Sequence, residues 1–209
     1  MKLAIFGATG KTGRHVLEQA LEAGHEVTAF VRDPAKLGGG HERLSVVQGV
    51  VADGARVLDA VRGQEAVIST LGQTRTSSRD VLTVAARNLV PAMREAGVLR
   101  LVTLVGAGVP DERDEGSVGR TLMRGLMKLA ARHVLEDAER HAEIVRGSEL
   151  EWTLVRPPRL TDRSRQGGYR TGYMKLGPKD SISRADLAEF MLTLATEGGY
   201  LRAAPMVTA

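Results

Sequence analysis

Short apolar runs alternate along this chain with segments in which apolar residues recur at helical spacing. The apolar runs predict strands at 2–6, 26–31, 43–48, 65–70, 99–105 and 151–157. The helical spacing predicts helices at 12–23, 55–63, 78–96, 118–146 and 184–196. A last apolar stretch at 204–209 reads as a seventh strand.

Regular alternation of strands and helices is typical of right-handed crossovers and a parallel sheet. Strands that are apolar throughout, such as "RLVTLV", fit burial on both faces. We therefore expect an α/β fold, a doubly wound parallel sheet with helices on both faces, as a single domain over residues 1–209. An acidic loop follows the fifth strand, and a basic loop region around 157–182 follows the sixth, at the edge where such sheets bind ligands.

The first strand runs directly into "FGATGKTG", with Gly7, Gly10 and Gly13 spaced three apart before a helix. The first glycine permits the tight turn, the second lets the backbone approach a pyrophosphate, and the third lets helix and strand pack closely. The N-terminus of the following helix offers free N–H groups to phosphates. A plain tight turn is the alternative, but the strand before and the helix after favour dinucleotide binding in a Rossmann-type fold.

Arg32 stands where the second strand ends, in "FVRDP". An acidic residue at this place would bind the ribose 2′-hydroxyl of NAD, whereas an arginine accommodates the 2′-phosphate of NADP. Asp33 is followed by proline and reads as a helix N-cap. The pattern favours NADPH as the cofactor, with a surface arginine of no such role as the alternative.

Composition excludes several other classes of protein. The chain has no cysteine, so disulfides, thiolate metal ligands and cysteine nucleophiles are absent, and we expect a cytoplasmic location. The formal net charge is only +4, with the arginines spread along the chain, so we expect no nucleic-acid partner. We expect no membrane segment and no metal site, because no run is long enough to span a bilayer and no His-Glu-x-x-His pattern occurs.

The sequence resembles the atypical short-chain dehydrogenase/reductase superfamily, and within it the NAD(P)H-binding group that includes biliverdin-IXβ/flavin reductase and the NmrA-like proteins. The resemblance covers nearly the whole chain, through "GATGKTG", "FVRDP", "VISTLG", "WTLVRPPRLTD" and "SRADLAEFM". It implies a Rossmann domain with NADPH across the strand ends. The cofactor-binding residues that it implies are Gly7, Thr9, Gly10, Lys11, Thr12, Gly13, Arg32, Leu71, Gly72, Arg75 and Pro157.

The chain departs from its relatives at two places. Relatives commonly have an aspartate near the adenine after the third strand, where this chain has Val50, and Asp53 reads instead as the N-cap of the next helix. Standard members use a tyrosine acid in Tyr-x-x-x-Lys. None of Tyr169, Tyr173 and Tyr200 is followed by lysine four residues later.

Without a tyrosine acid, hydride transfer is best suited to an acceptor whose product anion is delocalised. We therefore expect an NADPH-dependent oxidoreductase that acts on a flavin, a quinone or a similar conjugated small molecule. Arg159, in the turn after the sixth strand, is the candidate catalytic cation, and a solvent-facing loop arginine is the equal alternative.

Two rival functions fit parts of the pattern. A non-catalytic NADP(H) sensor of the NmrA-like kind also lacks the catalytic residues, although the long basic loop favours a substrate. An isomerase or epimerase is disfavoured by the missing Tyr-x-x-x-Lys and by a chain that is short for a substrate domain. No pattern in the sequence predicts an oligomeric state.

Overall fold

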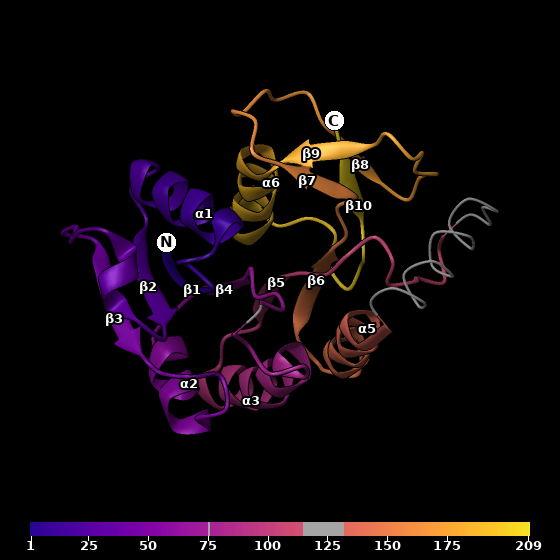
Figure 1. The fold of residues 1–209 in the computed structure, drawn as a ribbon. Helices are drawn as coiled ribbons and strands as arrows, with labels where there is room; N and C mark the ends of the chain where they lie inside the picture. The colour runs from indigo at the N-terminus through magenta and orange to yellow at the C-terminus, as the bar shows by residue number, and fades with distance from the viewer. Residues whose placement is uncertain (75, 115–131) are drawn as a thin grey trace.

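The computed structural model describes residues 1–74, 76–114 and 132–209. Its centre is a six-stranded sheet in the order β3-β2-β1-β4-β5-β6, and every neighbouring pair is parallel (Figure 1). The strands are β1 Lys2–Phe6, β2 Glu26–Val31, β3 Leu44–Gln48, β4 Ala66–Ser69, β5 Arg100–Leu104 and β6 Glu151–Val155. The strand order reverses between β1 and β4, so the sheet is doubly wound and its switch point lies at the end of β1.

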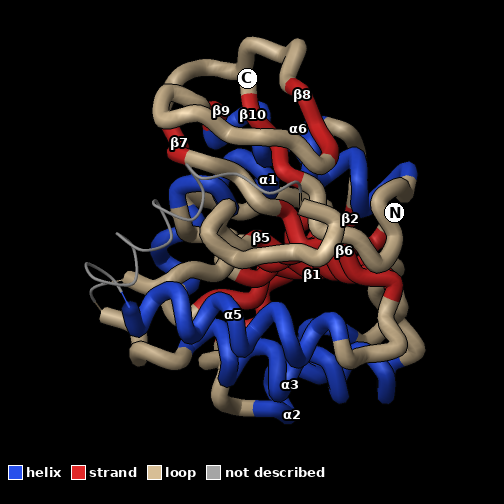
Figure 2. The backbone as a smooth tube through the Cα atoms, turned by 90° about the vertical axis from the view of Figure 1, so that its right-hand side faces the viewer, coloured by secondary structure: helices blue, strands red, loops and turns tan. Residues whose placement is uncertain are grey.

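Helices cover both faces of this sheet (Figures 1 and 2). One face carries α1 (Lys11–Glu22) and α6 (Arg184–Glu197), and the other carries α2 (Gly54–Val61), α3 (Val81–Ala96) and α5 (Arg132–Arg146). Successive strand residues serve opposite cores, as Phe6 packs on the α3 side and Ile5 on the α1 side, which explains the continuous apolar runs. Among the described residues, no helix combines the length and the apolar character that crossing a membrane requires.

The structure confirms the predicted fold class and the strands of the main sheet, with boundaries that match in β1 and β2 and shift by one or two residues in the other strands. The predicted helix at 118–146 is confirmed only over α5, because 118–131 lie outside the described residues. Two predicted N-caps are also confirmed. The carboxylate of Asp33 accepts a hydrogen bond from Ala35 N at the start of the 3₁₀ helix η1 (Pro34–Leu37), and that of Asp53 accepts one from Arg56 N.

The C-terminal region differs from the prediction. A strand does form near the end, β10 (Met206–Thr208), but it pairs antiparallel with β8 (Arg170–Gly172) rather than as a full seventh strand of the main sheet. Met206 of β10 forms an isolated parallel bridge with Arg156, the residue after β6. The region read as a basic loop contains further short strands, since β7 (Arg159–Thr161) pairs with β9 (Ser181–Ser183). These small sheets stand above the carboxyl end of β6 (Figure 2).

A buried arginine ties these segments together. The Arg156 guanidinium donates to both carboxylate oxygens of Asp114, at 2.6 and 2.8 Å, and to the carbonyls of Val109 and Ala204. Both partners of this ion pair are almost fully buried. A buried arginine needs such a set of acceptors, because an uncompensated charge there would be very unfavourable. Arg156 thereby anchors the loop after β5 to the C-terminal segment.

Candidate functional site

The glycine loop between β1 and α1 is folded tightly against itself and against β4. Gly7 has φ of +86°, a conformation that side chains other than glycine rarely adopt. A Cβ on Gly13 would lie 2.1 Å from Gly7 O, so only glycine permits this approach of helix and turn. The Thr70 hydroxyl lies 3.2 Å from Phe6 O and 3.3 Å from Gly7 O and holds the loop against the segment after β4.

The N-terminus of α1 is open to an anion. Gly10 is the N-cap, no side chain among the described residues caps it, and the first turn contains no acidic residue. A Cβ on Gly10 would meet only Gly7 O, at 3.2 Å, so the space beside this residue is otherwise clear. Unpaired N–H groups and the helix dipole favour a phosphate at such a place, and the cradle therefore fits the pyrophosphate of a dinucleotide.

Three further predicted residues lie in or beside this loop. Thr9 is half-buried and Thr12 is buried in the first turn of α1. Lys11 Nζ donates to Asp162 Oδ2 at 2.9 Å, and Asp162 also accepts from Arg184 Nη1 at 2.5 Å. The hydrogen bond from Lys11, together with the nearby charge of Arg184, lowers the pKa of Asp162. No pattern in the sequence predicts this bridge from the glycine loop to the segment after β7.

Arg32 directly follows β2, and its side chain is exposed. Within the described part of the chain, no hydrogen bond or ion pair holds its guanidinium, while the neighbouring acid is occupied. Asp33 accepts from Ala35 N at 3.1 Å and lies 3.6 Å from Lys36 Nζ. Arg14 Nη2 donates to Lys36 O at 2.8 Å, which ties this loop to α1. An exposed guanidinium without a partner among the described residues is available to bind an anion such as a phosphate.

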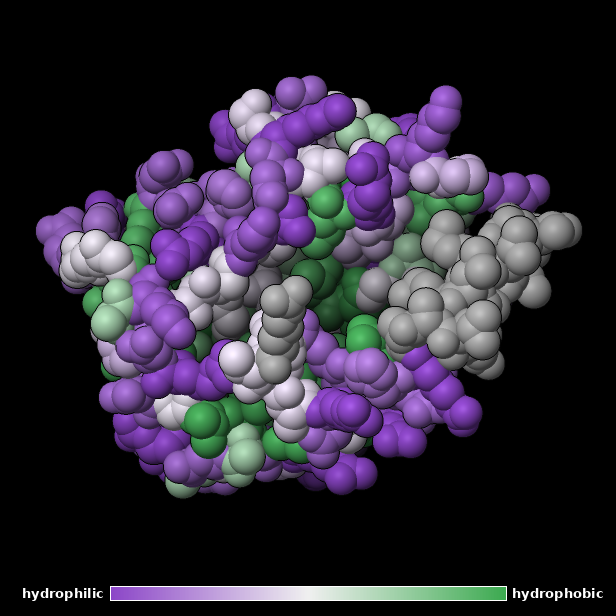
Figure 3. Space-filling view, in the orientation of Figure 1, coloured by the Kyte–Doolittle hydropathy of each residue, from purple (hydrophilic) through white to green (hydrophobic). Residues whose placement is uncertain are grey.

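The loops after β4 and β5 contribute two open glycine positions. A Cβ on Gly72 would meet nothing within 4 Å, and one on Gly106 would come no closer than 4.0 Å to Gly108 N. Leu71 is half-buried against the core on the α3 side. Arg75, the other residue predicted here, lies outside the described residues. Figure 3 shows a recess in this view, with hydrophobic residues at its floor and hydrophilic residues around it.

The segment after β6 holds the last two predicted residues. Pro157 is buried, and its carbonyl accepts from Ala107 N at 3.1 Å, which joins the turn to the loop after β5. Arg159 opens β7 and is exposed, and its guanidinium has no hydrogen bond or ion pair with the residues that the structure describes. The alternatives for Arg159, a catalytic cation or a solvent-facing residue, both fit this position.

Sequence reasoning missed a buried polar cluster beneath these loops. Asp137 and His141 lie four residues apart on α5, a spacing that places both on one helix face. His141 Nδ1 lies 3.1 Å from Leu82 O, and Nε2 lies 3.1 Å from Thr103 Oγ1. Burial lowers the pKa of His141. Since a carbonyl only accepts, Nδ1 is the donor and a neutral Nε2 accepts from the threonine hydroxyl.

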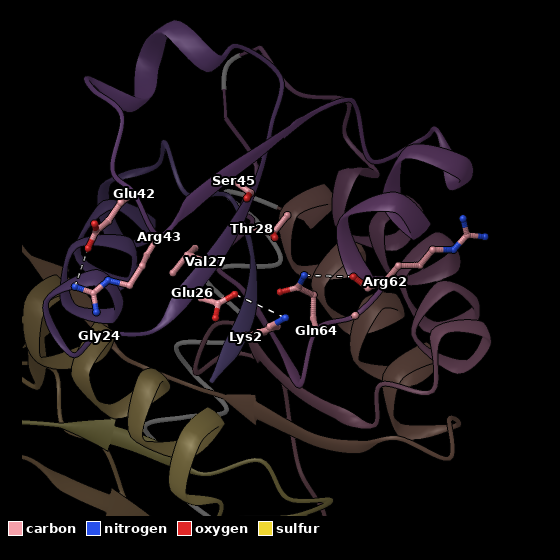
Figure 4. Close-up of a pocket in the computed structure, with 11 residues that line it drawn as sticks. Lys2, Gly24, Glu26, Val27, Thr28, Glu42, Arg43, Ser45, Arg62 and Gln64 are labelled. Carbon is pink, nitrogen blue, oxygen red and sulfur yellow. Dashed lines mark hydrogen bonds and ion pairs between the residues drawn. The ribbon is translucent and has the colours of Figure 1, made fainter.

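A cavity of about 430 Å³ lies elsewhere, at the amino ends of the strands (Figure 4). Lys2, Glu26, Thr28, Ser45 and Gln64 are among the residues that line it. Its charged side chains are partly paired with one another, as Lys2 with Glu26 and Arg43 with Glu42. In the described residues, no group of three or more His, Asp and Glu side chains is placed to hold a metal ion.

Relatives of known sequence resemble different lengths of this chain. The uncharacterised protein YwnB of Bacillus subtilis is 26% identical over 183 residues, which cover 87% of this chain and 81% of YwnB. The isoflavone reductase homologue IRL of Zea mays is 31% identical over 105 residues, which cover 46% of this chain and 32% of IRL. The chain thus spans about a third of the length of the plant reductase homologue.

Solved structures share the fold over the whole chain. ChuY, an anaerobillin reductase from Escherichia coli O157:H7, superposes with a TM-score of 0.82 at 21% identity and covers 99% of this chain and 96% of its own. A short-chain dehydrogenase/reductase from Veillonella parvula in complex with NADP superposes with a TM-score of 0.78 at 18% identity, over 100% of this chain and 94% of its own. The sequence profile of the NAD(P)H-binding family matches residues 7–198, a range that begins at the first glycine of the loop and ends just after α6. This chain is therefore a member of the NAD(P)H-binding family of Rossmann-fold, oxidoreductase-like proteins.

Proposed function

We propose that this protein is an NADPH-dependent reductase that transfers hydride to a flavin, a quinone or a similar conjugated small molecule. The observation that carries the proposal is the contrast at the end of β2, where Arg32 is exposed and unpaired within the described residues while Asp33 is engaged in capping η1. Membership of an NAD(P)H-binding family supports the dinucleotide, and a fold neighbour in complex with NADP supports the phosphorylated form.

Three parts of the chain would hold the cofactor. The backbone of the glycine loop and the uncapped first turn of α1 would bind the pyrophosphate. Arg32 would pair with the 2′-phosphate. The segments around Gly72 and Pro157 would line the remainder, as in the family that the sequence resembles. When bound, the reduced nicotinamide supplies the hydride, and the protein supplies orientation and electrostatics.

The choice of acceptor rests on which acids the chain offers. Reduction of a ketone localises negative charge on one oxygen and needs a proton donor beside it. The sequence has no Tyr-x-x-x-Lys to supply that donor. A flavin or quinone spreads that charge over a ring system, so that orientation and one cation suffice. Arg159, exposed at the start of β7, would supply that cation. The reductases among the relatives and neighbours support this class of reaction.

The experiment is NADPH oxidation followed against a panel of flavins, quinones and linear tetrapyrroles, with simple aliphatic ketones as controls. We expect turnover with one or more conjugated acceptors and none with the ketones. Tight NADPH binding without turnover of any acceptor would favour the sensor instead. Robust ketone reduction would contradict the argument from the missing acid.

Arg159→Ala tests the cation. We expect it to lower kcat with the preferred acceptor by about tenfold or more, while the Kd for NADPH stays within about twofold of the wild-type value. Arg163→Ala, which removes another exposed arginine of the same segment, is the matched control. If both variants lower kcat equally, the effect is a general one of loop charge, and Arg159 has no individual role.

A further inference from the structure

Asp137 on α5 is buried beneath the loops of the candidate site, and its carboxylate is fully engaged. Oδ1 accepts from Thr83 N at 2.9 Å and from Thr83 Oγ1 at 2.7 Å. Oδ2 accepts from Leu82 N at 3.1 Å and from Gln73 Nε2 at 3.0 Å. Only 3% of the residue is exposed, so these four donors replace water around a carboxylate in a nearly dry site.

Three of these donors belong to α3, and they explain a structural role. The helix begins at Val81, and its N-cap residue Asp80 makes no side-chain hydrogen bond to the helix. Leu82 N and Thr83 N are the groups that an N-cap would normally satisfy. Asp137 supplies that cap from another helix, where its negative charge also meets the positive end of the α3 dipole.

The fourth donor, Gln73, comes from the loop after β4, and its Nε2 also donates to Arg79 O at 2.5 Å, just before α3. Two contacts tie this loop to other parts of the fold. Thr70 contacts Phe6 O and Gly7 O of the glycine loop, and Gln73 contacts Asp137. Between the two points lie Leu71 and Gly72, the residues expected along the middle of the cofactor.

The position of Asp137 is itself fixed by its neighbour one turn later. His141 is held between Leu82 O and Thr103 Oγ1, so it locks this face of α5 against both α3 and β5. A carboxylate on a locked helix is a rigid acceptor, and Gln73 is thereby held at a defined distance from the sheet.

We propose that Asp137 is a positioning residue for dinucleotide binding: through Gln73 it fixes the loop after β4 in the conformation that receives the middle of the cofactor. This inference rests on the proposed NADPH-dependent function. It assigns to α5 a role in the site even though the helix lacks the tyrosine and lysine of standard members of the superfamily.

Two variants that each remove one hydrogen bond to the same carboxylate separate this role from capping. Gln73→Leu removes the link to the loop, and Thr83→Val removes a link to α3 with little change of shape. We measure the Kd for NADPH and for NADH by fluorescence titration and the Tm of each variant. Gln73→Leu is expected to weaken both dinucleotides by about tenfold, the scale of one hydrogen bond to a charged group. Thr83→Val is expected to lower Tm and to leave both Kd values within about twofold of wild type.

Equal weakening of both dinucleotides is expected because NADPH and NADH differ only at the 2′-position, far from this loop. An unchanged Kd in Gln73→Leu, or an equal loss of affinity in Thr83→Val, overturns the inference. Wild-type protein that binds neither dinucleotide overturns the proposed function, and tight wild-type binding with an unchanged Gln73→Leu Kd overturns the inference alone.

A double-mutant cycle with Asp137→Asn then tests the route of the effect. If Gln73 acts through Asp137, Gln73→Leu costs little further affinity in the Asp137→Asn background. An undiminished effect in that background would mean that Gln73 acts through Arg79 O or on the cofactor directly, and the positioning role of Asp137 would be wrong.

Discussion

Replacement of Arg32 by glutamine should remove most of the preference for NADPH over NADH. The guanidinium is exposed at the end of β2, and within the described residues the substitution breaks no hydrogen bond or ion pair of this group. The carboxylate of Asp33, which could otherwise bind the ribose 2′-hydroxyl of NADH, accepts a hydrogen bond from Ala35 N and lies beside Lys36, so it serves as a helix cap. The preference therefore depends on the bonds that Arg32 would make to the 2′-phosphate.

The magnitude follows from two charge-assisted hydrogen bonds in an exposed setting. Such bonds contribute about 1.5–3 kcal/mol each, and exposure to solvent places the pair near the lower end, at about 2–3 kcal/mol in total. That range corresponds to about 30- to 150-fold in the ratio of Kd values. We expect the wild-type protein to prefer NADPH by this factor and Arg32→Gln to bring the ratio to within a few-fold of one.

The assay is a titration of each cofactor at low and at physiological salt. Salt should weaken NADPH binding more than NADH binding in the wild type, because it screens the added phosphate charge. Arg87→Gln, which removes an exposed arginine in the middle of α3, controls for net charge and should leave the ratio unchanged. Equal wild-type affinities, or a ratio that survives Arg32→Gln, would refute the role given to Arg32.

Four other substitutions test separate parts of the structure. Gly10→Val should abolish dinucleotide binding in a folded protein, because the valine side chain enters the space expected for the phosphates. Gly13→Ala should destabilise the fold itself, because its Cβ would lie 2.1 Å from Gly7 O. Circular dichroism with cofactor titration separates the two effects, and normal binding by Gly10→Val would contradict the geometry. Burial lowers the pKa of His141 in the folded protein, so at mildly acidic pH this histidine is protonated more in the unfolded chain, and the free energy of unfolding should fall as the pH drops below about 6.5. Urea unfolding at several pH values should show a smaller fall in His141→Gln. An equal fall in that variant would mean that another group titrates. Arg100→Met should lower the free energy of unfolding by about 1–3 kcal/mol, the cost of leaving buried acceptors unsatisfied, because the carbonyls of Leu194, Glu151 and Gly199 lose their shared donor. A loss below about 0.5 kcal/mol in chemical denaturation would mean that water replaces the guanidinium.

Much of the fold could be predicted because its signals are local. The inner strands β1, β4 and β5 are largely apolar since helices cover both faces of the sheet, and that pattern is visible in a few residues at a time. The N-caps Asp33 and Asp53 contact backbone N–H groups two and three residues ahead, so a short window of sequence contains the whole motif. The glycine loop is equally local, because Gly7 and Gly13, which pack against each other, both belong to the turn between β1 and α1.

The sequence predicted a strand near the C-terminus but not its pairing, which depends on a partner distant along the chain. The segment at 204–209 has the composition of a sheet strand, yet β10 pairs with β8, more than thirty residues away along the chain, in a separate small sheet. Nothing local distinguishes these pairings, because an apolar strand fits any open edge and tertiary packing decides which one.

The sequence by itself determined the alternation of strands and helices, the glycine loop and the arginine that follows β2, because each depends on contacts within a few residues. Only the tertiary structure decided that Asp137 caps a helix 54 residues away, that Asp162 reaches Lys11 across 151 residues, and that Arg156 is buried on Asp114. In the sequence these are ordinary charged residues on polar helix or loop positions. Asp137 and Arg156 are buried, so each charge depends on the particular partner that the fold brings to it in place of water. The pair of Asp162 and Lys11 is exposed, and it forms because the fold brings two distant segments together.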